Sequence, residues 1–480
     1  MVQNIVKESV YSKTIKNLIG SIFSMTSFQD SIYEVATEYF KYAQENEIKK
    51  NAIEQQIISD KQALEKDPKS STLNHNIKIS QKILKEFNLK QEEEKQSRLE
   101  KIKTICHDIL NLCKGKDESD QNNKFARILG TIQLMTPTNT KAAINQNKKS
   151  KHLYRAVLSL LLFEQLMKDE QITNPYIQEI KNRALDEDDD EVYQNEVQIP
   201  VLMSALLLDV GSHHPDALEI LKGKDGKLNE FRTLTNEERL SLLKISYHQT
   251  INYLTHGIGS AKYIGNSKEQ RDVFNKNEKE KMSFILNLFK RSVDPKQGIG
   301  NIIKIPQIYV SVVLSTRSNF VYQSLPKVFL LLHKGAEKGS HSQVVVNSLQ
   351  KILGIYPPGF GITYIPKNAD GIDLDRFEYA IVSGIYPKNH HEPIVRIATK
   401  NLTFTSSGHD ITVQPDNNLF YANCRKKLEK VSSERLNEIL QKLWSNFENR
   451  TNEAQFVPNC WEPHEYFSYI KYQNLWNKNR

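Results

Sequence analysis

The stretch ALLLDVGSHHPDALEIL, residues 205–221, runs from an apolar helical segment directly into Asp209 and Gly211. An ionised carboxylate at the end of a buried helix costs several kcal/mol unless a cation or hydrogen-bond donors compensate it. Two histidines, His213 and His214, follow at once. Because carboxylate and imidazole groups are common metal ligands, this stretch predicts either a metal-binding turn or a carboxylate paired within a helical core.

Composition places the chain among globular proteins. Its 480 residues are 39% hydrophobic and 9% aromatic, and 65 basic against 57 acidic residues give a net charge of +8. This excess is small for the length and predicts no nucleic-acid partner. The four cysteines lack the spacing of a zinc site or a disulfide framework. The apolar runs are shorter than the roughly 20 residues that cross a bilayer, and the N-terminus does not resemble a signal peptide, so we expect a cytoplasmic protein without a membrane span.

The N-terminal region predicts a helical hairpin or short coiled coil. Residues 29–113 are polar and helix-forming, with a break at KDPKSS, residues 66–71, where Pro68 cannot continue a helix. Its sparse apolar stripes would serve equally for homodimerisation, for partner binding or for packing on the rest of the chain. The adjacent His107 and Asp108 should lie on the solvent-facing flank of this helix.

The central region predicts long apolar helices. A polar connector, NQNKKSK at 145–151, precedes a helix that opens with His152, and the acidic run LDEDDDEV at 185–192 should be a solvated loop. Thr235 and Glu238 have the spacing of a capping box, which begins the helix that carries His248.

Beyond Gly354, short β-branched runs between Gly, Pro and Asn predict a small β unit. An amphipathic helix follows at 432–447, and the Trp- and Tyr-rich tail should dock on the protein. The predicted fold class is mainly α, with an all-helical domain, an N-terminal helical hairpin and a small C-terminal β unit. The predicted boundaries are 1–145, 146–354, 355–420 and 421–480.

From His152 to Pro366 the order of features resembles the HD-GYP domain, the helical cyclic-di-GMP phosphodiesterase module of bacteria. The landmarks are His152, LLLDVG at 206–211, YHQTINYL at 247–254, DPKQGIG at 294–300 and LGIYPPGFGITYIP at 353–366. The resemblance implies an HD-type helical fold and a site in which two or three metal ions activate water and neutralise phosphate. It also implies that His152, Asp209 and His248 correspond to metal ligands.

The sequence departs from the family pattern at the other ligands. Leu208 stands where the family has the His of its HD pair, and Ser212 replaces the Lys that follows the Gly. Residues 285–300 contain neither His nor Glu, and residues 310–319 contain no acid. Because catalytic metals usually keep three protein ligands, we expect a catalytically inactive protein without a cofactor. The alternative is an active phosphodiesterase with a rearranged iron or manganese site that uses His213 or His214.

A domain of this fold that no longer binds metal ions can still bind partner molecules. The resemblance implies docking of signalling proteins such as diguanylate cyclases or adaptors, and we expect the interaction loop at Gly298, Gly300 and Asn301. Cyclic-di-GMP itself is a further possible ligand, with Arg317 or Arg291 on phosphate and Tyr309 stacking on a base. In an inactive protein, His152, Asp209 and His248 are expected to be hydrogen-bonded in the core.

Overall fold

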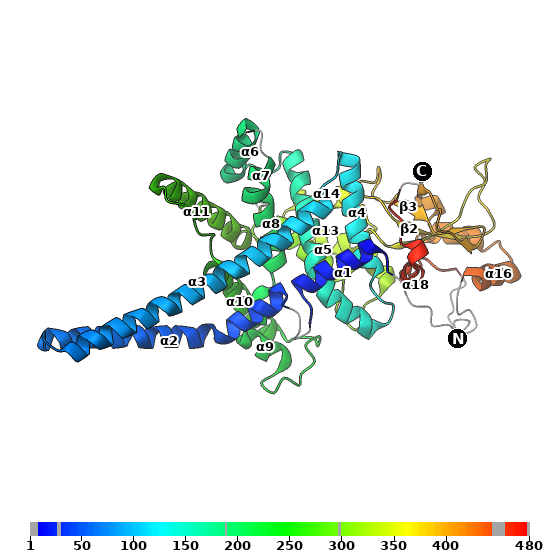
Figure 1. The fold of residues 1–480 in the computed structure, drawn as a ribbon. Coiled ribbons are helices and arrows are strands. Elements are labelled where there is room, and N and C mark those ends of the chain that lie inside the picture. The colour runs from blue at the N-terminus through cyan, green and yellow to red at the C-terminus, as the bar shows by residue number, and fades with distance from the viewer. Residues whose placement is uncertain (1–7, 26–29, 188–189, 296–298, 444–456, 478–480) are drawn as a thin grey trace. The chain divides into compact units, whose positions relative to one another are not determined.

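The computed structural model describes residues 8–25, 30–187, 190–295, 299–443 and 457–477. The protein is mainly helical, with a small antiparallel sheet in the C-terminal region, as the sequence predicts (Figure 1). The chain forms two compact units. The larger consists of Met1–Gly20, Asp108–Ala205 and Asn287–Arg480, and the smaller of Ser21–His107 and Leu206–Leu286. These units do not follow the sequence boundaries at 145, 354 and 420.

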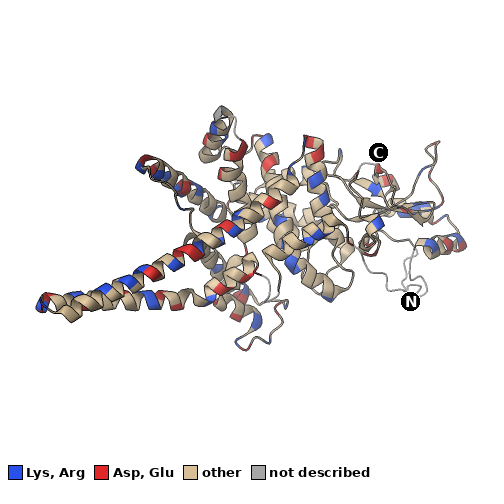
Figure 2. Cartoon of the chain, viewed as in Figure 1, with Lys and Arg blue, Asp and Glu red and all other residues tan. Residues whose placement is uncertain are grey.

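The smaller unit contains the predicted helical hairpin. Helix α2 (Ile32–Lys66) ends just before Pro68, and α3 (Ser71–Cys113) returns after a short turn (Figure 1). Acidic and basic side chains are interspersed along both helices (Figure 2). Few apolar side chains are buried along the outer hairpin, among them Ile57 and Ile77. His107 and Asp108 lie exposed on α3, as predicted.

Aromatic rings hold the base of the hairpin within the smaller unit. The ring centroid of Tyr39 lies 5.4 Å from that of Tyr253, and the guanidinium of Arg98 covers Tyr39 at 5.0 Å. Arg98 Nε also donates a hydrogen bond to the carbonyl of Gly257. The predicted capping box of Thr235 and Glu238 is confirmed. The unit's remaining elements are the 3₁₀ turn η2 (Val210–His213), α9 (Pro215–Lys222), α10 (Asn236–Asn252), the π-helical turn η3 (Tyr253–Ile258) and α11 (Lys268–Lys290).

Helix α5 (Thr140–Lys168) lies at the centre of the larger unit, against α4 (Glu118–Leu134), α12 (Asn301–Val313) and α14 (Gln343–Leu353). The connector predicted at 145–151 is wrong, because α5 runs through it. Lys, Gln and Asn are tolerated in helices, and Asn139 caps the helix ahead of them. His152 therefore lies in the middle of a helix.

The other helical elements of this unit precede or follow that centre. The acidic run predicted as a loop is helical in α6 and α7, on either side of the undescribed residues 188–189. The elements are α1 (Val10–Ile22), α6 (Pro175–Glu187), α7 (Asp190–Tyr193), the π-helical turn η1 (Gln194–Gln198), α8 (Ile199–Leu207), the 3₁₀ turn η4 (Tyr322–Lys327) and α13 (Val328–Glu337).

The predicted β unit is a four-stranded antiparallel sheet in the order β1-β2-β3-β6. Its strands are β1 (Gly361–Tyr364), β2 (Glu378–Val382), β3 (Ile394–Ile397) and β6 (Asp410–Thr412); β4 (Thr399–Lys400) and β5 (Thr403–Phe404) form a separate pair. After the sheet come η5 (Pro415–Asn417), α15 (Ala422–Leu428), α16 (Ser433–Leu443), α18 (His464–Ser468) and η6 (Ile470–Tyr472). Helix α16 confirms the described part of the predicted amphipathic helix.

The aromatic tail docks on the sheet, as predicted. Trp461 stacks on Tyr379 with ring centroids 4.6 Å apart, and its Nε1 donates to the carbonyl of Ala380 at 2.8 Å. Trp476 Nε1 donates to the carbonyl of Ser383, also at 2.8 Å. Both indole N–H groups are therefore satisfied by backbone oxygens of β2 and its continuation.

All four cysteines are buried and free of disulfide bonds. Among the helices that the structure describes, none combines the length and the apolarity that crossing a bilayer requires.

Replacing Trp461 should loosen the docked tail. We expect Trp461→Ala to lower the free energy of unfolding by about 2–3 kcal/mol, because it removes an aromatic stack and a satisfied indole N–H. Tyr469→Ala is a matched control in the same tail, since Tyr469 is 47% exposed, and it should change stability by less than about 0.5 kcal/mol. Urea unfolding measures both; equal effects would contradict docking through Trp461.

Candidate functional site

The Asp209 turn lies in the smaller unit, between the last residue of α8, Leu207, and the first residue of α9, Pro215. The carbonyl of Asp209 accepts hydrogen bonds from the backbone N–H of Ser212 at 3.0 Å and from its hydroxyl at 2.6 Å. The N–H of Gly211 donates to Thr250 Oγ1 of α10 at 3.0 Å. Ser212, at the position where the family has a Lys, thus closes the turn on itself.

Gly211 lets the turn approach α10 closely. A Cβ atom at this position would lie 2.0 Å from the carbonyl oxygen of Ser246 and 2.6 Å from the backbone nitrogen of Thr250. Both of these atoms belong to helix backbone, which cannot rotate away as a side chain can. The glycine of the Asp-x-Gly sequence is therefore explained by helix packing.

Adding a methyl group at this contact should destabilise the protein. We expect Gly211→Ala to lower the free energy of unfolding by about 3 kcal/mol, because α10 must shift or lose its hydrogen bond to the turn. Gly226→Ala is the control, since a Cβ there meets nothing within 4 Å, although its φ of +70° carries some backbone strain. Thermal or urea unfolding measures the difference, and an effect of Gly211→Ala no larger than that of the control would contradict the packing role.

His213 packs among aromatic rings. Its centroid lies 5.0 Å from that of Tyr33 and 5.5 Å from that of Phe23, both approached edge to face. Its Nδ1 lies 3.1 Å from Thr37 Oγ1, and that hydroxyl donates its proton to the carbonyl of Tyr33. His213 Nδ1 must therefore be the donor to Thr37, which makes this nitrogen unavailable as a ligand.

His214 is the N-cap of α9. Its Nδ1 accepts a hydrogen bond from the backbone N–H of Asp216 at 3.2 Å, and its ring packs 5.5 Å from that of Phe40. Burial lowers the pKa of His214, while Asp216 opposes this shift and His248 adds to it. His214 therefore serves the start of α9.

The lowered pKa of His214 predicts a pH dependence of stability. The unfolded chain takes up this proton near the ordinary pKa of about 6.5, whereas the folded protein resists it, so stability falls as the pH drops through this range. His214→Asn keeps a capping oxygen but removes the titration. We expect its urea midpoint to change less between pH 7.5 and 5.5 than that of the wild type. An identical pH dependence in the two proteins would contradict this role of His214.

The other two histidines that the resemblance implies as ligands, His248 and His152, lie in different surroundings. His248 is exposed on α10, so the expectation that it is buried in the core is wrong. His152 belongs to the larger unit, where it is 1% exposed and its Nδ1 lies 3.4 Å from Arg155 Nη2. A guanidinium at this distance disfavours a second cation on the imidazole.

The described residues around Asp209 do not provide the full ligand set that the family resemblance implies. His213 uses Nδ1 as a donor, and the Nδ1 lone pair of His214 is engaged by the cap. Leu208 supplies no ligand atom. Within the described part of the chain, no group of three or more His, Cys, Asp and Glu side chains is placed to hold a metal ion.

The described end of the predicted interaction loop is a buried joint. A Cβ on Gly300 would lie 2.1 Å from the carbonyl carbon of Arg291. Asn301 is fully buried; its Nδ2 donates to the carbonyls of Ser292 and Asp294, both at 3.2 Å, and its Oδ1 accepts from the N–H of Ser342. The expectation of an exposed loop is therefore wrong at Gly300 and Asn301. Gly298 lies outside the described residues.

The groups expected to bind cyclic-di-GMP are not poised for it either. Tyr309, expected to stack on a base, is fully buried on α12. Arg291 forms an ion pair with Asp294 at 3.1 Å. Arg317 is exposed and lines a pocket of the larger unit.

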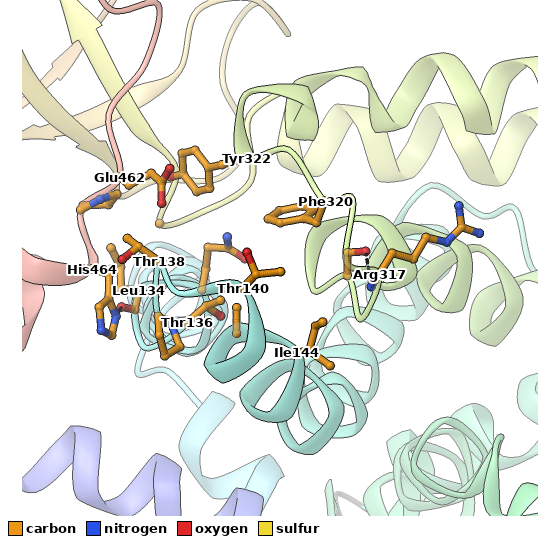
Figure 3. A pocket seen from close by; sticks show the side chains of 16 residues that line it. Leu134, Thr136, Thr138, Thr140, Ile144, Arg317, Phe320, Tyr322, Glu462 and His464 are labelled. Carbon is orange, nitrogen blue, oxygen red and sulfur yellow. Dashed lines mark hydrogen bonds between the residues drawn. The ribbon is translucent and has the colours of Figure 1, made fainter. Parts of the chain in front are cut away.

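This pocket, called here the α5 pocket, has a volume of about 90 Å³ (Figure 3). Its walls come from the end of α4, the first turn of α5, the loop after α12, the turn at Gly359 and the tail segment 462–464. The buried Asn147 ties two walls together, because its Oδ1 accepts from the hydroxyl of Thr136 at 2.9 Å and its Nδ2 donates to the carbonyl of Ser315 at 2.8 Å.

An unsatisfied amide lines the α5 pocket. Gln133 is 5% exposed, and its Oε1 has no hydrogen-bond partner among the described residues. A Cβ on Gly359 would lie 2.9 Å from Gln133 Cβ, and the φ of Gly359 is +88°, so only glycine fits against this side chain. Buried carbonyl oxygens without a partner are rare and costly in native proteins. Gln133 therefore marks a place where a hydrogen-bond donor is missing.

Other polar groups of the pocket have defined roles. His464 Nδ1 lies 3.0 Å from the carbonyl of Leu134 and must donate to it, so in the neutral ring Nε2 is an acceptor. The Tyr322 hydroxyl accepts from the N–H of Gly361 at 2.9 Å, and its pKa is raised well above the ordinary value, mainly by burial. Tyr322 thus keeps its proton and can donate it. Glu462 adds a carboxylate.

The α5 pocket could not be foreseen from the sequence. Its walls come from positions between 133 and 464, and no local motif links them. One sequence feature of the pocket is local: Asn139 precedes Thr140 and is a favourable N-cap residue, which predicts that a helix begins there, before the expected boundary at residue 145.

No protein-family model, curated protein or solved structure matches the chain.

Proposed function

We propose that this chain is a catalytically inactive HD-GYP-like protein that acts by binding a protein partner. The observation that carries the proposal is the packing role of the two histidines after Asp209, both of which use Nδ1 in helix contacts. His213 donates to Thr37 within an aromatic cluster, and His214 caps α9. The catalytic turn of the resembled family has thus become a joint between helices.

Exposed apolar side chains support the binding role. More than half of the large hydrophobic side chains that are exposed in the described residues lie in the smaller unit. On α10, Leu240, Leu243 and Tyr247 are 59, 54 and 46% exposed. Their spacing places them on one face of the helix, the arrangement with which helices dock into the groove of a partner.

The first test separates binding from catalysis. We expect the purified full-length protein to hydrolyse no cyclic-di-GMP with added manganese or iron(II), and Asp209→Ala to change neither its metal content nor its hydrolysis, because a catalytic metal needs about three protein ligands and the described residues gather no such group. Plasma mass spectrometry and a chromatographic assay measure these quantities. Near-stoichiometric metal that is lost in Asp209→Ala, together with hydrolysis, would establish the alternative, an active phosphodiesterase.

The binding role has its own control. Proteins captured from the native host by the wild-type chain should be lost with the double variant Leu240→Ser, Leu243→Ser. They should be kept with Leu330→Ser, which alters a 69% exposed side chain on α13 of the larger unit. Circular dichroism checks that each variant is folded. Equal capture by all three proteins would contradict docking through α10.

A further inference from the structure

We propose that the α5 pocket binds a small zwitterion of the α-amino acid class. The inference goes beyond the proposed function, because it concerns the larger unit and depends neither on the Asp209 turn nor on α10. It starts from Gln133, whose buried Oε1 lines the pocket and has no partner among the described residues. A ligand with an N–H or O–H group would satisfy it.

An ammonium group matches the acceptors that line the α5 pocket. It carries three N–H donors. Gln133 Oε1 offers one acceptor, and His464 Nε2 offers another because its Nδ1 is used on the carbonyl of Leu134. The Glu462 carboxylate adds negative charge to the same pocket, and Figure 3 shows it beside Tyr322. These groups favour a cationic donor over an anion at this end.

A carboxylate matches the other end, where α5 begins. The first N–H groups of a helix lack intrahelical partners and carry partial positive charge, so helix N-termini bind anions. Asn139 satisfies the N–H of Ala142, whereas the N–H of Thr140 has no hydrogen bond within the described residues. Figure 3 shows Arg317 directed away from Thr140 and the other labelled side chains. The helix start, and not the arginine, is therefore the anion-binding end.

The size of the pocket limits the ligand. A group the size of a water molecule needs roughly 10–15 Å³ of cavity volume. The α5 pocket, at about 90 Å³, therefore holds a ligand of roughly six to nine non-hydrogen atoms. Alanine and serine fall in this range. Drug-sized ligands occupy pockets of roughly 300–1,000 Å³. A cyclic dinucleotide is therefore too large for the α5 pocket.

Calorimetry with the full-length protein tests the proposal. The probes are L-alanine and L-serine, with methylammonium chloride and sodium acetate as the two half-ligands. We expect saturable binding of an amino acid, at least tenfold tighter than that of either half. Gln133→Met and Glu462→Gln should each weaken it about tenfold, since each removes one partner of the ammonium group.

Gln165→Met is the matched control. Gln165 is also a helix glutamine that is 5% exposed, but it lies outside the pocket and bonds Asp169. This variant should bind the amino acid as the wild type does. No heat at millimolar amino acid, equal binding by all variants, or equally tight binding of acetate or methylammonium would each overturn the proposal. Such a failure would leave the proposed protein-binding function untouched, because that function is tested through Asp209 and α10.

Discussion

The buried guanidinium of Arg155 constrains the packing of the larger unit. It is 2% exposed within the most apolar stretch of α5, where an uncompensated ion would cost several kcal/mol. Its Nε donates to the carbonyl of Ala205 at 2.7 Å. That carbonyl belongs to the last turn of α8, whose oxygens have no intrahelical partner. The guanidinium of Arg155 thus satisfies a carbonyl oxygen at the end of α8. The Asp209 turn begins directly after this helix end.

The guanidinium of Arg155 also lies beside His152 and disfavours a metal cation on its imidazole. The resemblance implies a metal ligand at this position, but the imidazole lies against a guanidinium that also bonds α8. His213 and His214 each use Nδ1 for a helix contact. A histidine binds a metal through one ring nitrogen while the other makes a hydrogen bond, so a metal site also needs further ligands within reach and no cation beside them. Residue type and order are therefore insufficient to assign a metal site.

The parts of the fold that could be predicted are those encoded by short-range chemistry. Pro68 breaks the hairpin, Thr235 and Glu238 cap α10, and alternating β-branched runs form the sheet. The failures arose where polar residues were taken as loops. Residues 145–151 are helical because Asn139 starts α5 earlier and Asn147 uses its polarity inside the protein, between Thr136 and Ser315. A polar side chain in the sequence does not show whether its partner is water or another segment.

The α5 pocket also shows that the sequence does not reveal the partner of a polar side chain. Gln133 reads in sequence as one more polar residue of α4, and only the fold shows that it is buried without a partner for its Oε1. A buried polar atom that lacks a hydrogen-bond partner in the free protein raises the free energy of that state. A ligand that supplies the partner removes this cost and binds more tightly for that reason. Because Gly359 packs against Gln133 and tail segment 462–464 lines the same pocket, tail segment and ligand should stabilise each other. The docked tail is thus a wall of the pocket as well as a cover for the sheet.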